Sequence, residues 1–179
     1  PFALGGNVFN SSWWQFYGTS DRCLEFEPER YDYRFITADT AQKTSELNDY
    51  SVFILWGRKG DKVYFIDGVR GKWEAPELRT NFEAFVNQSW RENKNMGTLR
   101  KIYVEDKASG TGLIQDLAKK TPIKITPLQR DKDKTTRAMD AQPVIKAGRV
   151  VLPDNHPLIA EFLAEHSAFT YDDSHKHDD

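Results

Sequence analysis

The sequence has little of what marks several protein classes. It holds one cysteine, Cys23, in 179 residues, so no internal disulfide can form, which suits a reducing compartment. No stretch of about 18 apolar residues occurs, and we therefore expect no membrane-spanning helix. The opening residues PFALGG have no basic region ahead of an apolar one, so we expect no secretory signal there. No glycine-rich loop with a Walker-type lysine is present, so we expect no ATPase activity from this chain alone.

The composition is that of a folded domain. Of the residues, 39% are hydrophobic and 13% aromatic, which suits one domain with a sizeable core rather than a disordered chain. The formal net charge of -2 argues against a purely electrostatic nucleic-acid binder. It does not exclude a nuclease, because the negative charge of an acidic active site offsets the positive charge of basic grooves elsewhere. Lysine and arginine concentrate at 119–149, whereas aspartate and histidine concentrate in the last ten residues.

Hydrophobic periodicity predicts the element order β-β-β-α-β-α-β-α-α. The expected strands are 33–38, 50–56, 62–69, 101–104 and 123–127, and a brief extended piece is expected at 149–152. The expected helices are 76–90, 110–119, 134–146 and 157–166. The glycines at 57–61 indicate a hairpin between the second and third strands, and Pro143 should kink or break its helix. Three antiparallel strands followed by alternating strands and helices indicate an α/β fold with a mixed sheet and helices on both faces. The apolar segment at 13–17 should dock on the domain.

Three acidic clusters are candidate metal-binding and catalytic groups. Asp39 lies in RFITADTA, at the end of its apolar part, Glu105 and Asp106 follow IYV, and Asp178 and Asp179 close the chain as HKHDD. If strands 33–38 and 101–104 are neighbours, the first two clusters meet at one edge of the sheet. Carboxylates that converge need a cation between them, and hard oxygen ligands suit Mg²⁺ or Mn²⁺. Two such ions about 3.5–4 Å apart can hydrolyse a phosphodiester.

Each candidate also has a plainer interpretation. An aspartate at a strand end, such as Asp39, is often a turn or cap residue, and acidic tails are usually solvated. A buried carboxylate that continues a strand, as Glu105 does, costs free energy unless it is paired or bound to a metal. His175 and His177 beside one aspartate form a weak zinc pattern, and His177 could instead orient a metal ligand.

The ordered segments DYSVFILWGRKGDKVYFIDGVRGKWEAPELR, IYVEDKASGTGLIQDL, DKTTRAMDAQPVIKAGRVVLP and HDD closely resemble the C-terminal nuclease domain of the tailed-bacteriophage terminase large subunit. The resemblance covers nearly the whole chain, from about GGNVF onwards. It implies an RNase H-like fold and a metal-dependent endonuclease. In that family the nuclease cuts concatemeric viral DNA to genome length at the start and end of packaging into the procapsid.

The resemblance also implies roles for individual residues. Asp39 matches the first catalytic carboxylate and Glu105 the second, and the HDD motif supplies a third from Asp178 or Asp179. Neighbouring side chains on a helix point about 100° apart, so we favour Asp179 if that motif starts a helix, with Asp106 as a secondary ligand. In this scheme Asp39 bridges two Mg²⁺ or Mn²⁺ ions, Glu105 and Asp179 each hold one, and an activated water attacks the phosphorus.

DNA contacts are expected from basic residues. Lys132, Lys134 and Arg137 lie just before and on an expected helix and could contact the DNA backbone, although a solvated helix face would have the same composition. Lys107, next to the second acidic cluster, is a further candidate, and His177 could orient the metal ligands.

The resemblance further implies double-stranded DNA, an ATPase motor domain, a small terminase subunit and a portal protein as partners, with the host cytoplasm as location. Residues 1–20 would enter from the motor domain and 21–179 would form the nuclease, expected to be monomeric in isolation. The family's HDD continues into a helix with another aspartate, whereas this sequence stops at Asp179, as expected for an excised domain. Two alternatives are a resolvase- or transposase-type nuclease, and a non-catalytic module that docks on the portal or motor.

Overall fold

The computed structural model describes residues 6–41, 50–92, 94–105, 108–129 and 131–171. Within these ranges, seven strands are hydrogen-bonded in the order β1-β7-β4-β3-β2-β5-β6. The strands are β1 Gln15–Tyr17, β2 Tyr33–Asp39, β3 Ser51–Lys59, β4 Lys62–Gly71, β5 Leu99–Glu105, β6 Lys124–Leu128 and β7 Val150–Pro153. The helices are η1 Ser11–Trp13, α1 Ala75–Arg91, η2 Lys94–Met96, α2 Ala108–Ala118, α3 Lys134–Lys146 and α4 Ile159–Ala168.

The chain divides into two compact units. A central unit comprises 28–60 and 65–130, and a terminal unit comprises 1–27, 61–64 and 131–178. Strand β4 belongs to both, because its first residues pair in parallel with β7 while the rest of the strand continues into the central unit.

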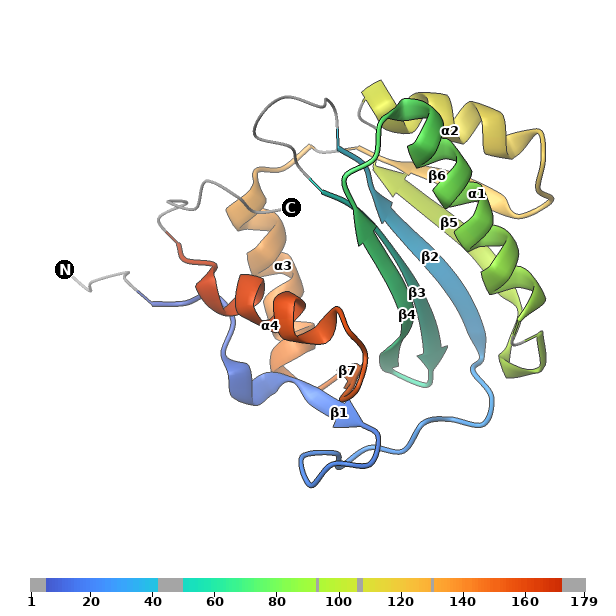
Figure 1. The fold of residues 1–179 in the computed structure, drawn as a ribbon. Helices are drawn as coiled ribbons and strands as arrows, with labels where there is room; N and C mark the ends of the chain where they lie inside the picture. Colours follow the sequence, from blue (N-terminus) through green and yellow to red (C-terminus); the bar gives the residue numbers. More distant parts are fainter. Residues whose placement is uncertain (1–5, 42–49, 93, 106–107, 130, 172–179) are drawn as a thin grey trace. The chain divides into compact units, whose positions relative to one another are not determined.

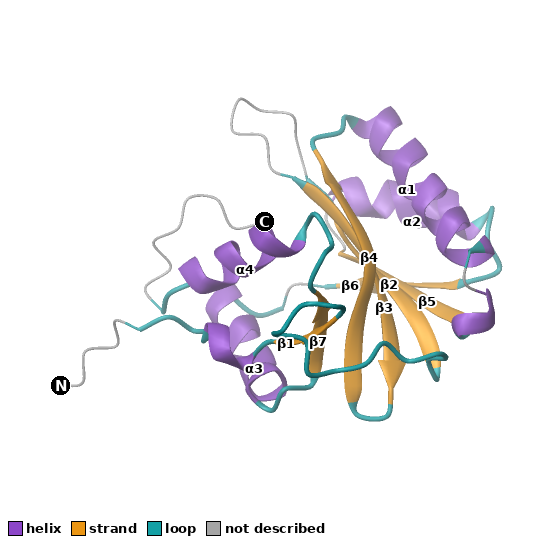
Figure 2. Ribbon diagram, turned by 60° about the horizontal axis from the view of Figure 1, so that its bottom comes forward, coloured by secondary structure: helices purple, strands orange, loops and turns teal. Residues whose placement is uncertain are grey.

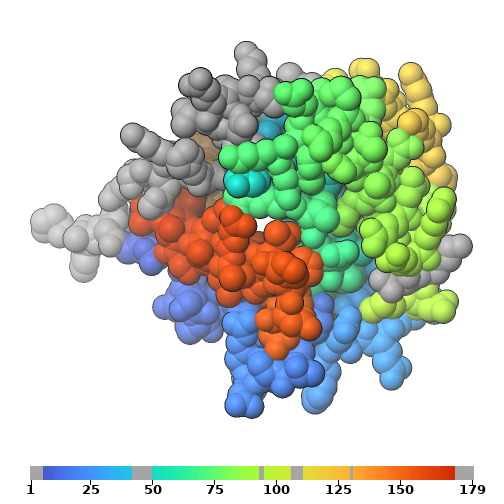
Figure 3. Space-filling view, in the orientation of Figure 1, coloured from blue at the N-terminus to red at the C-terminus, as the bar shows by residue number. Residues whose placement is uncertain are grey.

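In the central unit, α1 and α2 pack on one face of the sheet (Figure 1, Figure 2). Strand β2 runs antiparallel to β3 and parallel to β5, and β5 runs parallel to β6. Alternate residues of these strands, such as Ile36, Phe53 and Ile102, are fully buried against Phe82 of α1. Every second residue of the strands and one face of the helix are apolar, and these two surfaces pack together as one core. The outer face of α1 forms part of the molecular surface, in green in Figure 3.

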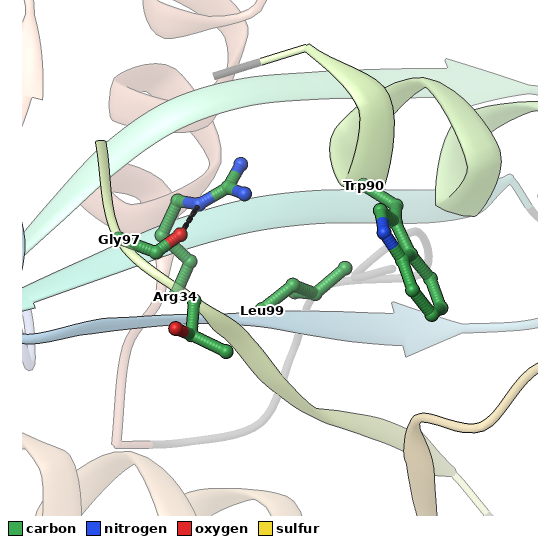
Figure 4. Close-up of a pocket in the computed structure, with 5 residues that line it drawn as sticks. Arg34, Trp90, Gly97 and Leu99 are labelled. Atoms are coloured by element: carbon green, nitrogen blue, oxygen red, sulfur yellow. Dashed lines mark hydrogen bonds between the residues drawn. The ribbon is translucent and has the colours of Figure 1, made fainter. Parts of the chain in front are cut away.

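A buried arginine connects three elements of this unit. Arg34 on β2 is 1% exposed. Its Nε donates to the carbonyl of Gly97 at 2.7 Å (Figure 4). Its Nη1 donates to the carbonyl of Ser89, in the last turn of α1, at 2.8 Å. Burial lowers the pKa of this guanidinium from its usual value. Arg34, Gly97 and Leu99 line a pocket of about 190 Å³ together with Trp90. Glycine is required at position 97, because its φ is 125° and a Cβ there would lie 2.7 Å from the carbonyl oxygen of Tyr31.

In the terminal unit, the short strand β1 pairs in parallel with β7. The sequence predicted docking of the apolar segment that contains β1, and Trp14 and Tyr17 are indeed 4% and 7% exposed. Trp14 packs edge-on against Phe162 and His166 of α4, with ring centroids 5.3 and 5.2 Å apart.

Most expected elements are confirmed, with corrections at their ends. The helix expected at 110–119 is α2 at 108–118, and the one expected at 157–166 is α4 at 159–168. Of the two outcomes expected at Pro143, a kink or a break, the break is wrong, since α3 continues to Lys146. The proline costs this helix one hydrogen bond close to its end, where later carbonyls lack partners in any case. Strand β1 was not expected, because three residues carry no periodic signal. No helix in the described part of the chain is long and apolar enough to cross a bilayer.

Candidate metal centre at the end of strands β2 and β5

Two acidic residues predicted from the sequence lie side by side. Ala38 on β2 pairs with Val104 on β5, and the two strands are parallel. Asp39 and Glu105 are the next residues along each strand, so their backbones are separated by about 5 Å, the spacing of neighbouring strands. The expectation that these strand ends are adjacent is therefore confirmed.

Both carboxylates are placed on the face of the sheet opposite α1 and α2. Ala38 and Val104 face the core, and strand alternation turns the residue after each of them to the other side. The aromatic residues Phe35 and Tyr103 occupy the same outer face, with ring centroids 6.0 Å apart. Asp39 and Glu105 thus continue a row of side chains that lie outside the hydrophobic core cluster.

The end of β2 is held by polar contacts with β3. Thr40 and Ser51 are fully buried, and the backbone N–H of Ala41 donates to Ser51 Oγ at 3.0 Å. Asp39 pairs with Val52 in the antiparallel ladder. These contacts fix the backbone on both sides of Asp39, so its carboxylate is presented from a rigid strand rather than from a loop.

The two carboxylates differ in exposure. Glu105 is 7% exposed and its Oε1 is enclosed by protein, whereas Asp39 is half-buried. A carboxylate that is removed from water beside a second carboxylate costs free energy, which a bound cation offsets. This donor set fits a hard divalent cation such as Mg²⁺ or Mn²⁺. Among the described residues, no group of three or more potential ligands comes together.

The other acidic candidates lie outside the described residues. These are Asp106, Asp178, Asp179 and His177, together with the basic candidate Lys107. Their predicted roles as metal ligands or DNA contacts remain predictions.

The basic residues at α3 belong to the terminal unit. Lys132 donates to Asp140 at 2.7 Å, and this hydrogen bond raises the pKa of its ammonium group. Lys134 begins α3, and the Nε of the half-buried Arg137 is enclosed by protein. The carboxylate of Asp140 offsets the charge of Lys132. The roles of Lys132, Lys134 and Arg137 as DNA contacts stay predictions.

Sequence reasoning missed a group of side chains at the same edge of the central unit. The Arg70 guanidinium lies 3.9 Å from the centre of the Tyr50 ring, and Lys72 Nζ lies 4.7 Å from it. We refer to Tyr50, Arg70 and Lys72 as the Tyr50 cluster. No local motif marks it, because its members come from the start of one strand and the end of the next.

Comparison with known proteins agrees with this architecture. The fold is of the RNase H-like class, with a mixed sheet of seven strands and four α-helices in the described ranges. The family model described as the terminase RNaseH-like domain matches residues 36–179, and the chain belongs to this family. No curated protein sequence matches the chain.

Several solved structures share the fold. A large terminase from a thermophilic bacteriophage aligns with a TM-score of 0.64 and 13% identity over 93% of this chain and 38% of its own. The large terminase nuclease of thermophilic phage G20c, solved with bound magnesium, aligns with a TM-score of 0.60 and 17% identity over 92% of this chain and 81% of its own. The P22 large terminase nuclease domain aligns with a TM-score of 0.55 and 16% identity over 90% of this chain and 80% of its own. The chain therefore spans just over a third of the length of the first of these proteins.

Proposed function

We propose that this chain is a divalent-metal-dependent DNA endonuclease of a viral packaging terminase. It would cut concatemeric viral DNA to genome length as packaging into the procapsid begins and ends. The observation that carries the proposal is the adjacency of Asp39 and Glu105 at the ends of two parallel strands, in a chain that belongs to the terminase RNase H-like family. The magnesium bound in the similar G20c nuclease supports a metal-dependent reaction.

Asp39 and Glu105 would hold the metal, together with a carboxylate from Asp178 or Asp179. When bound, two Mg²⁺ or Mn²⁺ ions would activate the attacking water and neutralise the charge that develops on the phosphate. The chain's own residues fix where this happens. The rigid end of β2 positions Asp39, and the burial of Glu105 strengthens its electrostatic interaction with any cation at the edge.

The same resemblance supports the remaining assignments. Residues 1–20 would connect to an ATPase motor domain that precedes the nuclease, and 21–179 would form the nuclease itself. The small terminase subunit and the portal protein would join the assembly in the host cytoplasm. A non-catalytic module that docks on the portal or motor would have no use for adjacent carboxylates at this edge, so it is the weaker proposal.

The decisive test is the Asp39→Asn variant. The amide keeps the shape of the side chain and removes the charge that would hold the metal. We expect cleavage of plasmid DNA in Mn²⁺ or Mg²⁺ to fall by at least about a thousandfold, since a whole catalytic unit is lost. Asp116→Asn on α2, which removes a surface ion pair with Arg79, is the matched control and should cut normally. Unimpaired cutting by the Asp39 variant would refute the proposal.

A further inference from the structure

Three exposed cations lie together on the outer face of the central sheet, the face opposite α1 and α2. They are Arg100 and Lys101 at the start of β5 and Lys124 at the start of β6, and we call them the basic cluster. Lys101 pairs with Lys124 in the parallel β5–β6 ladder, so their backbones are about 5 Å apart. Within the ranges that the structure describes, none of the three forms an ion pair.

A β-bulge gives two consecutive cations the same face. The register of β5 against β2 shifts by one residue at Arg100, which is the extra residue in β5. Leu99 and Ile102 are buried in the core, whereas Arg100 and Lys101 between them are exposed. Strict alternation would turn one of these two cations toward the core. Bulges commonly re-aim side chains in this way next to active sites.

Two of the cations lie near aromatic rings of the same face. The guanidinium carbon of Arg100 lies 4.9 Å from the centre of the Tyr33 ring, and Lys101 Nζ lies 6.0 Å from the centre of the Tyr103 ring. An aromatic ring attracts a cation through its quadrupole and carries no net charge, so the cation keeps its own. The rings therefore favour particular positions of these two side chains without neutralising them.

The basic cluster shares its face with the proposed metal site. Lys101, Tyr103 and Glu105 are alternate residues of β5 and lie on the same side of it. The rise of four residues separates Lys101 from Glu105 by about 13 Å along the strand. The row between them is formed by Thr37, Tyr103 and Thr126, which pair across β2, β5 and β6 and are uncharged. A DNA strand that runs along β5 from the metal site therefore crosses uncharged side chains before it reaches the cations.

This separation suits the DNA backbone. Base pairs of a duplex are stacked about 3.4 Å apart, so the separation of about 13 Å spans about four of them. Lysine and arginine bind phosphate oxygens through charge-assisted hydrogen bonds, and such contacts position a duplex without reading its base sequence. The cations are therefore placed to bind the backbone a few nucleotides away from a phosphate at the metal site.

We propose that the basic cluster binds backbone phosphates of the DNA substrate within about four nucleotides of the cut phosphate. The inference rests on the proposed nuclease function and adds the residues that position its substrate. Lys101 and Lys124 supply two charges from adjacent strands, and Arg100 supplies a planar donor fork. DNA is favoured over an acidic protein, because the cations lie on the face that carries the proposed metal ligands. Since the contacts are to the backbone, binding is independent of base sequence.

The test compares DNA binding and cleavage in the Lys101→Gln/Lys124→Gln double variant. Binding of a fluorescent duplex of about 30 base pairs is measured by anisotropy without divalent metal, at several salt concentrations. The loss of two phosphate contacts should weaken binding by about tenfold or more at about 0.1 M salt and should reduce the slope of log K against log salt by about 1.8. Two duplexes of unrelated sequence should lose affinity by the same factor. In cleavage assays the KM for DNA should rise by a much larger factor than kcat falls.

The matched control is Arg79→Gln/Lys120→Gln, which removes the same charge on the other side of the sheet. Arg79 pairs with Asp116 of α2, and Lys120 pairs with Glu83 of α1, so both cations belong to the helical layer. The control should bind DNA with close to the normal salt slope. Wild-type affinity and slope in the Lys101/Lys124 variant, or an equal loss in the control, would overturn the proposal.

Three further variants separate the alternatives. Lys101→Arg/Lys124→Arg keeps both charges and should retain affinity within about threefold, and a loss as large as that with glutamine would contradict a role for the charges. Arg100→Gln alone alters an exposed residue, so it should lower the salt slope by about 0.9 with an unchanged melting temperature. Asp39→Asn should bind the metal-free duplex at least as tightly as the wild type. Failure of the nuclease function, seen as normal cutting by Asp39→Asn, is thus distinguishable from failure of the binding site.

Discussion

Glu105 carries its carboxylate in a nearly closed position, with 7% of its surface exposed. A charged group in such a position near another carboxylate loses its hydration, and a bound cation would offset that cost. This buried position beside a second acidic residue is what we expect of the proposed metal site.

We expect Glu105→Gln to separate metal binding from folding. Mn²⁺ at about a hundred times its Kd should stabilise the wild type by about 2.7 kcal/mol and so raise its melting temperature. It should raise the melting temperature of the variant by less than half as much. Glu83→Gln, which breaks a surface ion pair with Lys120, should respond to Mn²⁺ as the wild type does.

We expect His166 to make the stability of the terminal unit depend on pH. Its ring lies 4.1 Å from the Phe162 ring and 5.2 Å from Trp14, measured between centroids. Burial lowers the pKa of this imidazole, and the hydrogen bond to the Phe162 carbonyl opposes that shift only in part. The unfolded chain therefore binds a proton more readily than the folded one near and below about pH 6.5.

Stability should consequently fall as the pH drops through the usual pKa of histidine, about 6.5, and should level off only below the lowered pKa of His166. His166→Phe removes the titrating group and should give a flatter profile in urea unfolding across the same pH range. The carboxylates with lowered pKa, Asp133 and Asp154, contribute in a lower window, near and below their usual pKa of 3.8. An equally steep decline in the His166 variant would contradict this assignment.

Packing between elements depends on Arg34 in the central unit. This side chain connects β2 to the last turn of α1 and to the turn that precedes β5. The macrodipole and the unsatisfied carbonyls at the end of α1 favour a cation there. One buried arginine therefore terminates a helix and fixes the start of two parallel strands whose other ends carry Asp39 and Glu105.

We expect Arg34→Met to destabilise the fold by about 3–5 kcal/mol, because two buried carbonyls lose their donors. Urea unfolding followed by circular dichroism measures this. Arg100→Met removes an exposed arginine that lies over Tyr33 and should cost less than about 0.5 kcal/mol. A comparable loss in both variants would show that the carbonyl contacts of Arg34 are not the cause.

The whole molecule contains more than the segment that the family model matches. The match begins at residue 36, yet β1 pairs with β7 and Trp14 is buried. The segment that the sequence assigned to the entry from a motor domain therefore also contributes an edge strand to the terminal unit.

Deletion of residues 1–17 should lower the melting temperature, because β7 loses a partner and α4 loses the aromatic contacts of Trp14. Trp14→Ala alone should cost about 3–5 kcal/mol, the usual range for a buried tryptophan. Differential scanning calorimetry of the two proteins beside the full chain measures both effects. An unchanged melting temperature in the deletion would mean that the segment is only a linker.

Local patterns in the sequence were enough to place Asp39 and Glu105. Each follows a β-branched run at a strand end, and period-two alternation is a short-range property that neighbouring residues determine. Arg34 was not predicted, because a charged residue in a strand signals burial only when the helix end that accepts its hydrogen bonds is known. The Tyr50 cluster was not predicted although the β3–β4 hairpin was, since the contact of Tyr50 with Arg70 depends on the register of the two strands at their far ends.

By itself, the sequence determined the elements, their order and the acidic strand ends, because these depend on periodicity and on residue type within a few positions. Only the tertiary structure decided that β2 and β5 are parallel neighbours, that Glu105 is buried, and that Tyr50 gathers two cations at the same edge. Strand pairing and burial depend on contacts between residues far apart in the chain, whose free energies no local pattern records.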